Sequence, residues 1–179
     1  FETGLNSNVL ATDLNEIDDS YVGFTPSITM NSNWQRHALD GYFGVEHVHY
    51  SELTDERHTD LKVKLRGRLD LGEQTSVTLG VSGADETEDR TALSNVPLST
   101  EPNEYTQIGG VFGFSHQAGR FITTASLAVN SYDHDDVEIA GALIQDQDFR
   151  DRDELTGAAR IAYAMNRNVA LYTSVDHTE

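Results

Sequence analysis

Four basic residues occupy alternate positions in one short segment, and apolar residues or glycine fill the positions between them. The basic set is Lys62, Lys64, Arg66 and Arg68, and the alternating set is Leu61, Val63, Leu65, Gly67 and Leu69. Successive side chains of a β-strand point to opposite faces, so this spacing predicts a strand with one basic and one apolar face. A row of cations can attract anionic solutes such as uronic-acid polymers.

The same cations could instead form ion pairs with acids on a neighbouring strand. If the segment 51–58 closes a hairpin symmetrically, Glu46 lies near Lys64 and Asp40 lies near Arg68. We favour ion pairing for the inner two cations, and for the outer two both interpretations stay open.

Four tyrosines lie where predicted strands meet long polar connections: Tyr21, Tyr50, Tyr105 and Tyr132. Such residues often form a girdle at a membrane interface. Counting along each strand, however, places all four with the polar residues, unless a β-bulge at the strand end reverses the parity. The second interpretation is a ring inside a channel mouth, where the rings stack on sugars and the hydroxyls bond to sugar hydroxyls.

Two acidic segments carry carboxylates at close spacing, "DHDDVE" (133–138) and "DQDFRDRDE" (146–154). Calcium takes six to eight oxygen ligands, so such segments can supply a site. They lack the EF-hand spacing of glycine and terminal glutamate, and a solvated acidic surface has the same composition. The calcium candidates are Asp133, Asp135, Asp136, Asp146 and Asp148.

Other catalytic or metal chemistry has little support. His47 and His49 share a strand face, but the sequence offers no evident third ligand near them. A hydrolase with a Ser/His/acid site at the rim of a barrel would be another class, yet no Gly-x-Ser-x-Gly motif is present. We therefore expect no enzyme activity and no cofactor other than calcium.

The composition narrows the class of protein further. The chain has 179 residues, no cysteine and a net charge of -18, from 30 acidic and 12 basic residues. This charge repels nucleic acid, so no nucleic-acid partner is expected. No stretch approaches the roughly 18 apolar residues of a membrane helix.

Alternation with a period of two recurs along the whole chain, which predicts strands throughout. Rows begin at Ser20, Leu39, Leu61, Val77, Ile108, Phe121, Leu155 and Val169, after a weaker first strand over 3–10, giving about nine strands. Pro26 falls inside the second row and predicts a bulge or a sheet edge there.

Short and long connections also alternate. Short turns are expected at 32–36, 72–74, 117–119 and 166–168, and long polar connections at 11–19, 51–58, 84–104 and 132–153. Short turns join antiparallel strands, so the two kinds of connection must lie at opposite ends of an up-and-down sheet. The long connections carry net charges of -4, -2, -5 and -6, which is nearly the whole charge of the chain.

A soluble β-sandwich also shows alternation. Transmembrane barrels, however, combine short turns at one end with long loops at the other, and lipid requires that every strand be paired. We therefore predict an all-β fold, an antiparallel up-and-down transmembrane β-barrel. The four cations must then line the lumen with Asp40 and Glu46, since each would cost about 2–4 kcal/mol against lipid at the midplane.

Bacterial single-chain barrels usually have an even number of strands. Nine strands, and an end at "SVDHTE" without a closing strand, lead us to expect that 1–179 is a single barrel domain and part of a longer barrel.

Three segments, "NSNVLATDLNEIDDSYVGFTPSI", "NWQRHALDGYFGVEHVHY" and "YTQIGGVFGFSHQAGRF", resemble the β-barrel porin type 2 family of Gram-negative outer membranes. The resemblance covers most of the chain, from about Asn6 to Tyr172. It implies an outer-membrane barrel in contact with membrane lipid and lipopolysaccharide. Members often accompany exopolysaccharide export systems, so it also implies polysaccharide and an export complex as partners. It assigns no functional residues.

Two functions follow from these observations. The first is an outer-membrane channel for saccharide polymers or other hydrophilic solutes. The alternative is a structural barrel that conducts nothing and anchors surface polymer or a partner assembly through its acidic external loops.

Overall fold

The computed structural model of the chain describes residues 1–13, 16–96, 99–140 and 143–179. Six long strands form the centre of one antiparallel sheet: β4 (Ala38–Tyr50), β5 (His58–Asp70), β6 (Thr75–Thr87), β7 (Glu104–Ala118), β8 (Phe121–His134) and β11 (Arg152–Ala164). At its two sides lie β1 (Glu2–Asn6), β2 (Asp19–Phe24), β3 (Ser27–Asn31) and β12 (Ala170–Thr178). Among the described residues no helix has the length and apolar character needed to cross a bilayer.

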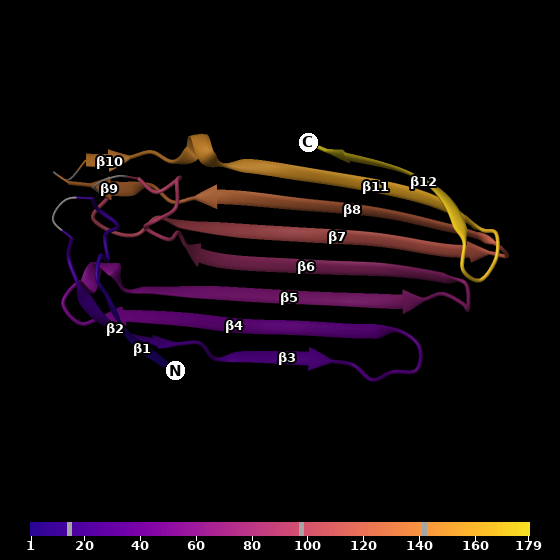
Figure 1. The fold of residues 1–179 in the computed structure, drawn as a ribbon, viewed down its shortest axis with the longest axis horizontal. Coiled ribbons are helices and arrows are strands. Elements are labelled where there is room, and N and C mark those ends of the chain that lie inside the picture. Colours follow the sequence, from indigo (N-terminus) through magenta and orange to yellow (C-terminus); the bar gives the residue numbers. More distant parts are fainter. Residues whose placement is uncertain (14–15, 97–98, 141–142) are drawn as a thin grey trace.

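The sheet runs up and down, because its strands pair in the order in which they occur along the chain (Figure 1). Its ten strands occupy nine positions, since β2 and β3 both pair with β4. The fold class predicted from the alternation is therefore confirmed. The sheet is open in this structure, with β1 and β12 at the ends of the pairing order. The expectation of a longer barrel stays a prediction.

Pro26 interrupts the strand between β2 and β3 without changing the register. Phe24 pairs with His47 before the break, and Ser27 pairs with Gly44 after it, so the same offset continues. Pro26 still accepts a hydrogen bond of 3.0 Å from the backbone N–H of Val45. Among the described residues β3 pairs with β4 alone. Of the two predicted alternatives the sheet edge is therefore confirmed and the bulge is wrong.

One face of the sheet is apolar and exposed. Leu61, Val63 and Leu65 on β5 are 39%, 41% and 44% exposed. Their neighbours across the sheet include Phe43, Val81, Leu79, Phe112, Leu127, Val129 and Leu155. A soluble sandwich would cover this face with a second layer. In the described part of the chain the buried apolar side chains are instead Val9, Val96, Val137 and Ala162, of which three lie in or near the long connections.

Long and short connections gather at opposite ends of the sheet, as predicted (Figure 1). The turn between β7 and β8 consists of two residues, Gly119 and Arg120, and Gly119 has a φ of 60°. Two-residue hairpin turns need positive φ, which glycine adopts at little cost. At the other end the connections contain two short 3-10 turns, η1 (Thr54–Glu56) and η2 (Asp148–Arg150).

Two local expectations were wrong. The first strand ends at Asn6 instead of reaching residue 10, and Val9 is buried, with its N–H donating to Ile17 O at 2.9 Å. The connection between β8 and β11 was expected to be a loop, but it contains the small hairpin of β9 (Val137–Ile139) and β10 (Leu143–Gln145).

Candidate functional site

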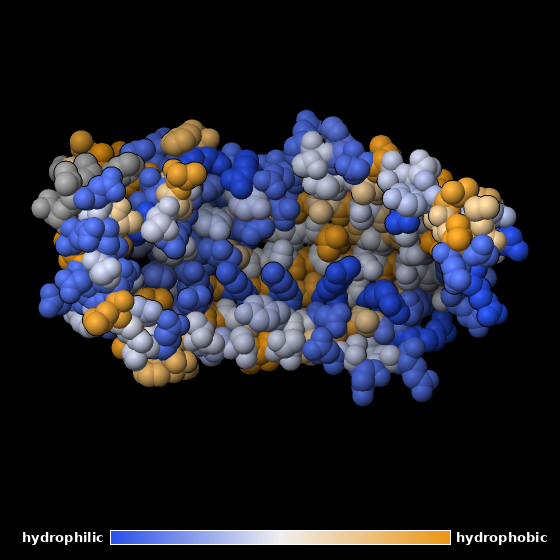
Figure 2. Space-filling model, viewed as in Figure 1, coloured by the Kyte–Doolittle hydropathy of each residue, from blue (hydrophilic) through white to orange (hydrophobic). Residues whose placement is uncertain are grey.

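The polar face of the sheet carries the four cations of β5. Across β4 and β6 they face Gly44, Tyr42, Asp40 and Ala38 on one side, and Ala84, Ser82, Gly80 and Thr78 on the other. The cations thus share a face with polar and small residues, opposite to Leu61 and Val63. Figure 2 shows this face, with a row of hydrophilic side chains along β5 over the middle of the sheet.

The expected partners of the cations were wrong. Glu46 lies opposite Asp60 and Asp40 lies opposite Arg66, because the β4–β5 ladder ends at Val48 and His58. The cause is the carboxylate of Asp19, which accepts the N–H groups of Glu52 and Leu53 at 2.8 and 2.9 Å. These bonds hold the start of the connection beside β2, so the hairpin does not close symmetrically.

The four tyrosines all lie on the polar face, and they form two separate pairs. The rings of Tyr21 and Tyr50 lie 5.8 Å apart on β2 and β4. On β7 and β8, Gln107 Nε2 donates to the Tyr132 hydroxyl at 3.3 Å. Tyr105 precedes Gln107 on the same face of β7 and lies nearer the loops, opposite His134. Each ladder keeps a single register without a bulge, so the parity counted from the sequence is preserved.

A hollow of about 550 Å³ opens beside the second tyrosine pair, at the loop end of the polar face. Tyr105 stacks on His134 with the ring centroids 5.4 Å apart, and the guanidinium of Arg152 lies 4.0 Å above the Tyr132 ring. Tyr105 also donates to Glu86 Oε2 at 2.9 Å. The hollow therefore combines aromatic rings with charged donors and acceptors, a mixture that suits sugar rings and their hydroxyls.

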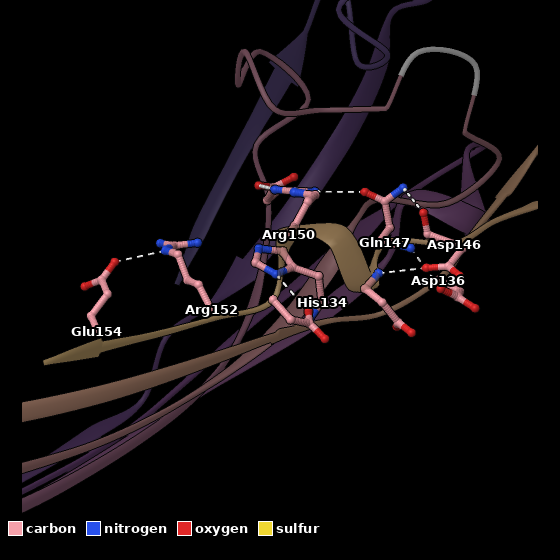
Figure 3. A network of polar contacts seen from close by, with 10 residues as sticks. His134, Asp136, Asp146, Gln147, Arg150, Arg152 and Glu154 are labelled. Carbon is pink, nitrogen blue, oxygen red and sulfur yellow. Dashed lines mark hydrogen bonds and ion pairs between the residues drawn. The ribbon is translucent and has the colours of Figure 1, made fainter. Parts of the chain in front are cut away.

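Figure 3 shows how the polar contacts beside this hollow are arranged. Arg152 Nε donates to Glu154 Oε1 at 2.9 Å, and both residues belong to β11. The backbone N–H of His134 donates to Asp151 Oδ1 at 2.8 Å, and its Nδ1 is buried 3.5 Å from the same oxygen. The end of β8 is thereby fixed to the segment that leads into β11.

A buried ion pair joins two long connections. Arg90 Nε and Nη2 donate to the two carboxylate oxygens of Glu56 at 3.0 and 2.5 Å, and both side chains are less than a tenth exposed. Arg90 Nη1 donates to the carbonyl and the hydroxyl of Ser99. The connection after β4 is therefore attached to the connection after β6.

A second ion pair attaches the connection after β8. Arg150 donates to Glu88 Oε1 and, at 3.3 Å, to Gln147 Oε1. Burial raises the pKa of Glu88, but hydrogen bonds from Arg150, Asn103 and Ser94 outweigh it and hold the pKa below its ordinary value. The long connections are thus folded against one another at the loop end of the sheet, here called the mouth.

Three of the five calcium candidates come together. Asp136, Asp146 and Asp148 place carboxylate oxygens within 4.8 Å of one another, and all three side chains are exposed. The charge of Asp146, then burial and the charge of Asp136, raise the pKa of Asp148. Asp133 and Asp135 lie outside this group. Calcium binding stays a prediction, which a terbium-luminescence titration of the protein and its D146N variant tests.

The two neighbouring histidines lie on the apolar-face side of β4, where His47 pairs with Phe24 and His49 with Val22. His47 Nδ1 is 2.7 Å from Thr59 Oγ1. Among the described residues, the one group of three or more potential metal ligands is the aspartate group, and it contains no histidine.

These observations describe a single two-faced antiparallel sheet with turns at one end and folded loops at the other. A family model described as "Putative beta-barrel porin 2" matches residues 1–179. The chain belongs to this family. The β-barrel porin 2 assignment confirms the resemblance found in the sequence. No curated protein and no solved structure gave a match.

Membership of the β-barrel porin 2 family implies an outer-membrane location and suggests a channel or structural role. Transmembrane barrels in general turn an apolar face to lipid and enclose a polar face. The family description does not extend to a solute, a polysaccharide or an export partner.

Sequence reasoning missed the groups that organise the mouth. Arg90 and Arg150 are the two cations of the long connections that are paired and largely buried, and their partners lie 34 and 62 residues away in sequence. The one available signal was that each is a basic residue inside a strongly acidic segment.

Proposed function

We propose that the protein is an outer-membrane channel for hydrophilic solutes, with saccharides as the leading class. The observation that carries this proposal is the division of one sheet into an exposed apolar face and a polar face. Such a sheet is stable in a bilayer when its apolar face contacts lipid and lipopolysaccharide and its polar face encloses water.

Saccharides are favoured by the aromatic groups at the mouth. Tyr105 and Tyr132 line the hollow of about 550 Å³, together with His134, Arg150 and Arg152. Tyr50 lines a smaller hollow of about 270 Å³ with Glu46, His58 and Asp60. Rings beside hydrogen-bonding side chains match the alternating apolar and hydroxyl surfaces of a sugar.

Conductance tests the proposal. The protein is reconstituted into planar bilayers and, separately, into liposomes that swell when a sugar enters. We expect stepwise ionic conductance and swelling in neutral oligosaccharides. Correctly inserted protein that conducts no ions would contradict the channel, and conductance without sugar entry would restrict it to ions.

A second candidate function rests on the folded mouth. The pairs Glu56–Arg90 and Glu88–Arg150 join three long connections into one assembly. A fixed, acidic surface of this kind could anchor surface polymer or an export complex without conduction. The variant D146N/D148N removes acidic charge from this surface and changes no strand residue. Loss of polymer or partner retention with unchanged conductance would favour the anchor.

A further inference from the structure

The four cations of β5, the basic stripe Lys62–Lys64–Arg66–Arg68, are unequally neutralised. Lys62 Nζ lies 3.1 Å from Glu86 Oε1, and Arg68 Nη2 lies 3.0 Å from Asp70 Oδ2. Within the described ranges no ion pair involves Lys64 or Arg66. The middle of the stripe therefore carries two adjacent cations that make no ion pair, although Asp40 lies opposite Arg66 on β4.

Small side chains leave room beside these two charges. On the polar face β6 and β7 present Thr78, Gly80, Ser82, Ala84, Gly109, Val111 and Gly113. A Cβ added to Gly80 would lie 2.7 Å from Val111 Cγ1 and 3.7 Å from Arg66 Cγ, so the Arg66 stem lies close over this floor. The stripe thus borders a shallow trough, as the middle of Figure 2 shows.

The geometry concentrates positive potential along the channel axis. Residues two apart on a strand are about 7 Å from each other, so the stripe spans about 20 Å. The distance between neighbouring cations is shorter than the Debye length of about 8 Å at physiological salt, so their fields add. Low-dielectric walls strengthen such a field and attract the opposite charge.

The acidic residues lie mainly at a different depth. The long connections contain Glu56, Glu88 and the aspartate group. Glu56 and Glu88 are already neutralised by ion pairs with Arg90 and Arg150. The floor of the trough beside Lys64 and Arg66 carries no carboxylate in the described parts of β6 and β7. On β4, Asp40 lies opposite Arg66, whereas Lys64 faces Tyr42 and Ser82. Two cations stand against this one carboxylate, so the middle of the trough keeps a positive excess.

We propose that the basic stripe makes the lumen selective for anions and is the interior binding track for carboxylated solutes, including acidic saccharides. This inference rests on the proposed channel function and adds the charge class of its solute. Several weak sites in a row allow an anion to enter and to leave, as conduction requires.

Reversal potentials in a KCl gradient across planar bilayers test the track. We expect the wild-type protein to pass chloride more readily than potassium, and K64Q/R66Q to lower that permeability ratio. R57Q/R167Q is the matched control, because it removes the same charge from two connections outside the sheet. Oligogalacturonate should block the wild-type current at lower concentrations than it blocks the K64Q/R66Q current.

The possible failures are distinguishable. Absence of conductance in correctly inserted protein would overturn the channel and this inference together. Conductance that is cation-selective, or a permeability ratio unchanged in K64Q/R66Q, would overturn the anion track alone. K64A/R66A provides a second pair, and the heat-dependent gel mobility of each variant verifies that it has folded.

Discussion

Glu56 and Arg90 form a bidentate ion pair between two connections at the mouth, and 5% and 9% of their side chains are exposed. Removing one member of a buried pair leaves the other charge without compensation, which typically costs about 3–5 kcal/mol. We therefore expect E56Q to increase amide hydrogen exchange in segment 88–103 and to leave β5 to β7 unchanged. The double variant E56L/R90L removes both charges and should restore much of the protection. Equal exchange in E56Q and wild type would contradict the role of the pair.

Acidification should loosen the mouth through Glu88. Because its pKa in the folded protein is below the ordinary value of 4.5, its ionised form stabilises the fold. That contribution is complete above pH 4.5 and is lost as the pH falls through the lower pKa of the folded state. Thermal unfolding followed by circular dichroism should show wild type losing stability below pH 4.5 more steeply than E88Q. Parallel pH profiles would contradict this prediction.

The mouth tyrosines should affect saccharides more than ions. We expect Y105A and Y132A to reduce the entry of oligosaccharides into liposomes, with little change in single-channel conductance. Y163A is the control, since Tyr163 lies on the apolar face near the short turns, packed against Phe121. Equal sugar entry in Y132A and wild type would remove the stacking interpretation.

Close packing on the polar face should make Gly80 sensitive to substitution. A Cβ at this position would lie 2.7 Å from Val111 Cγ1, and a β-branched side chain has little freedom to move aside. Overpacking of this kind typically costs about 1–3 kcal/mol, so G80A should unfold at lower denaturant concentration. G72A should be neutral because nothing lies within 4 Å of its added Cβ. V111A in the G80A background should recover the loss.

The sheet could be predicted from the sequence because its cause is local. Alternation fixes which residues share a face, and the nine positions of the sheet match the nine rows of the pattern. The β4–β5 register could not be predicted, because it depends on Asp19, which binds the backbone of Glu52 and Leu53 from another strand. A period of two specifies faces and leaves the offset between strands undetermined.

The mouth could be predicted only in part for the same reason. The polar-face placement of the four tyrosines follows from strand parity, and the ladders preserve it. The Glu88–Arg150 pair brings together residues 62 apart in sequence, and no periodic pattern indicates such a contact. The grouping of Asp136 with Asp146 and Asp148 likewise depends on the small hairpin of β9 and β10, whose three-residue strands are too short to show alternation.

The central claim is that adjacent residues of β5 face different solvents. The sequence contains no cysteine, so single cysteines can be placed at Val63, Lys64 and Leu65 and labelled in proteoliposomes. Spin labels at 63 and 65 should collide readily with oxygen dissolved in the bilayer, and a label at 64 should collide with a water-soluble nickel chelate. Labels at 63 and 65 that are as accessible to the chelate as the label at 64 would contradict the membrane assignment.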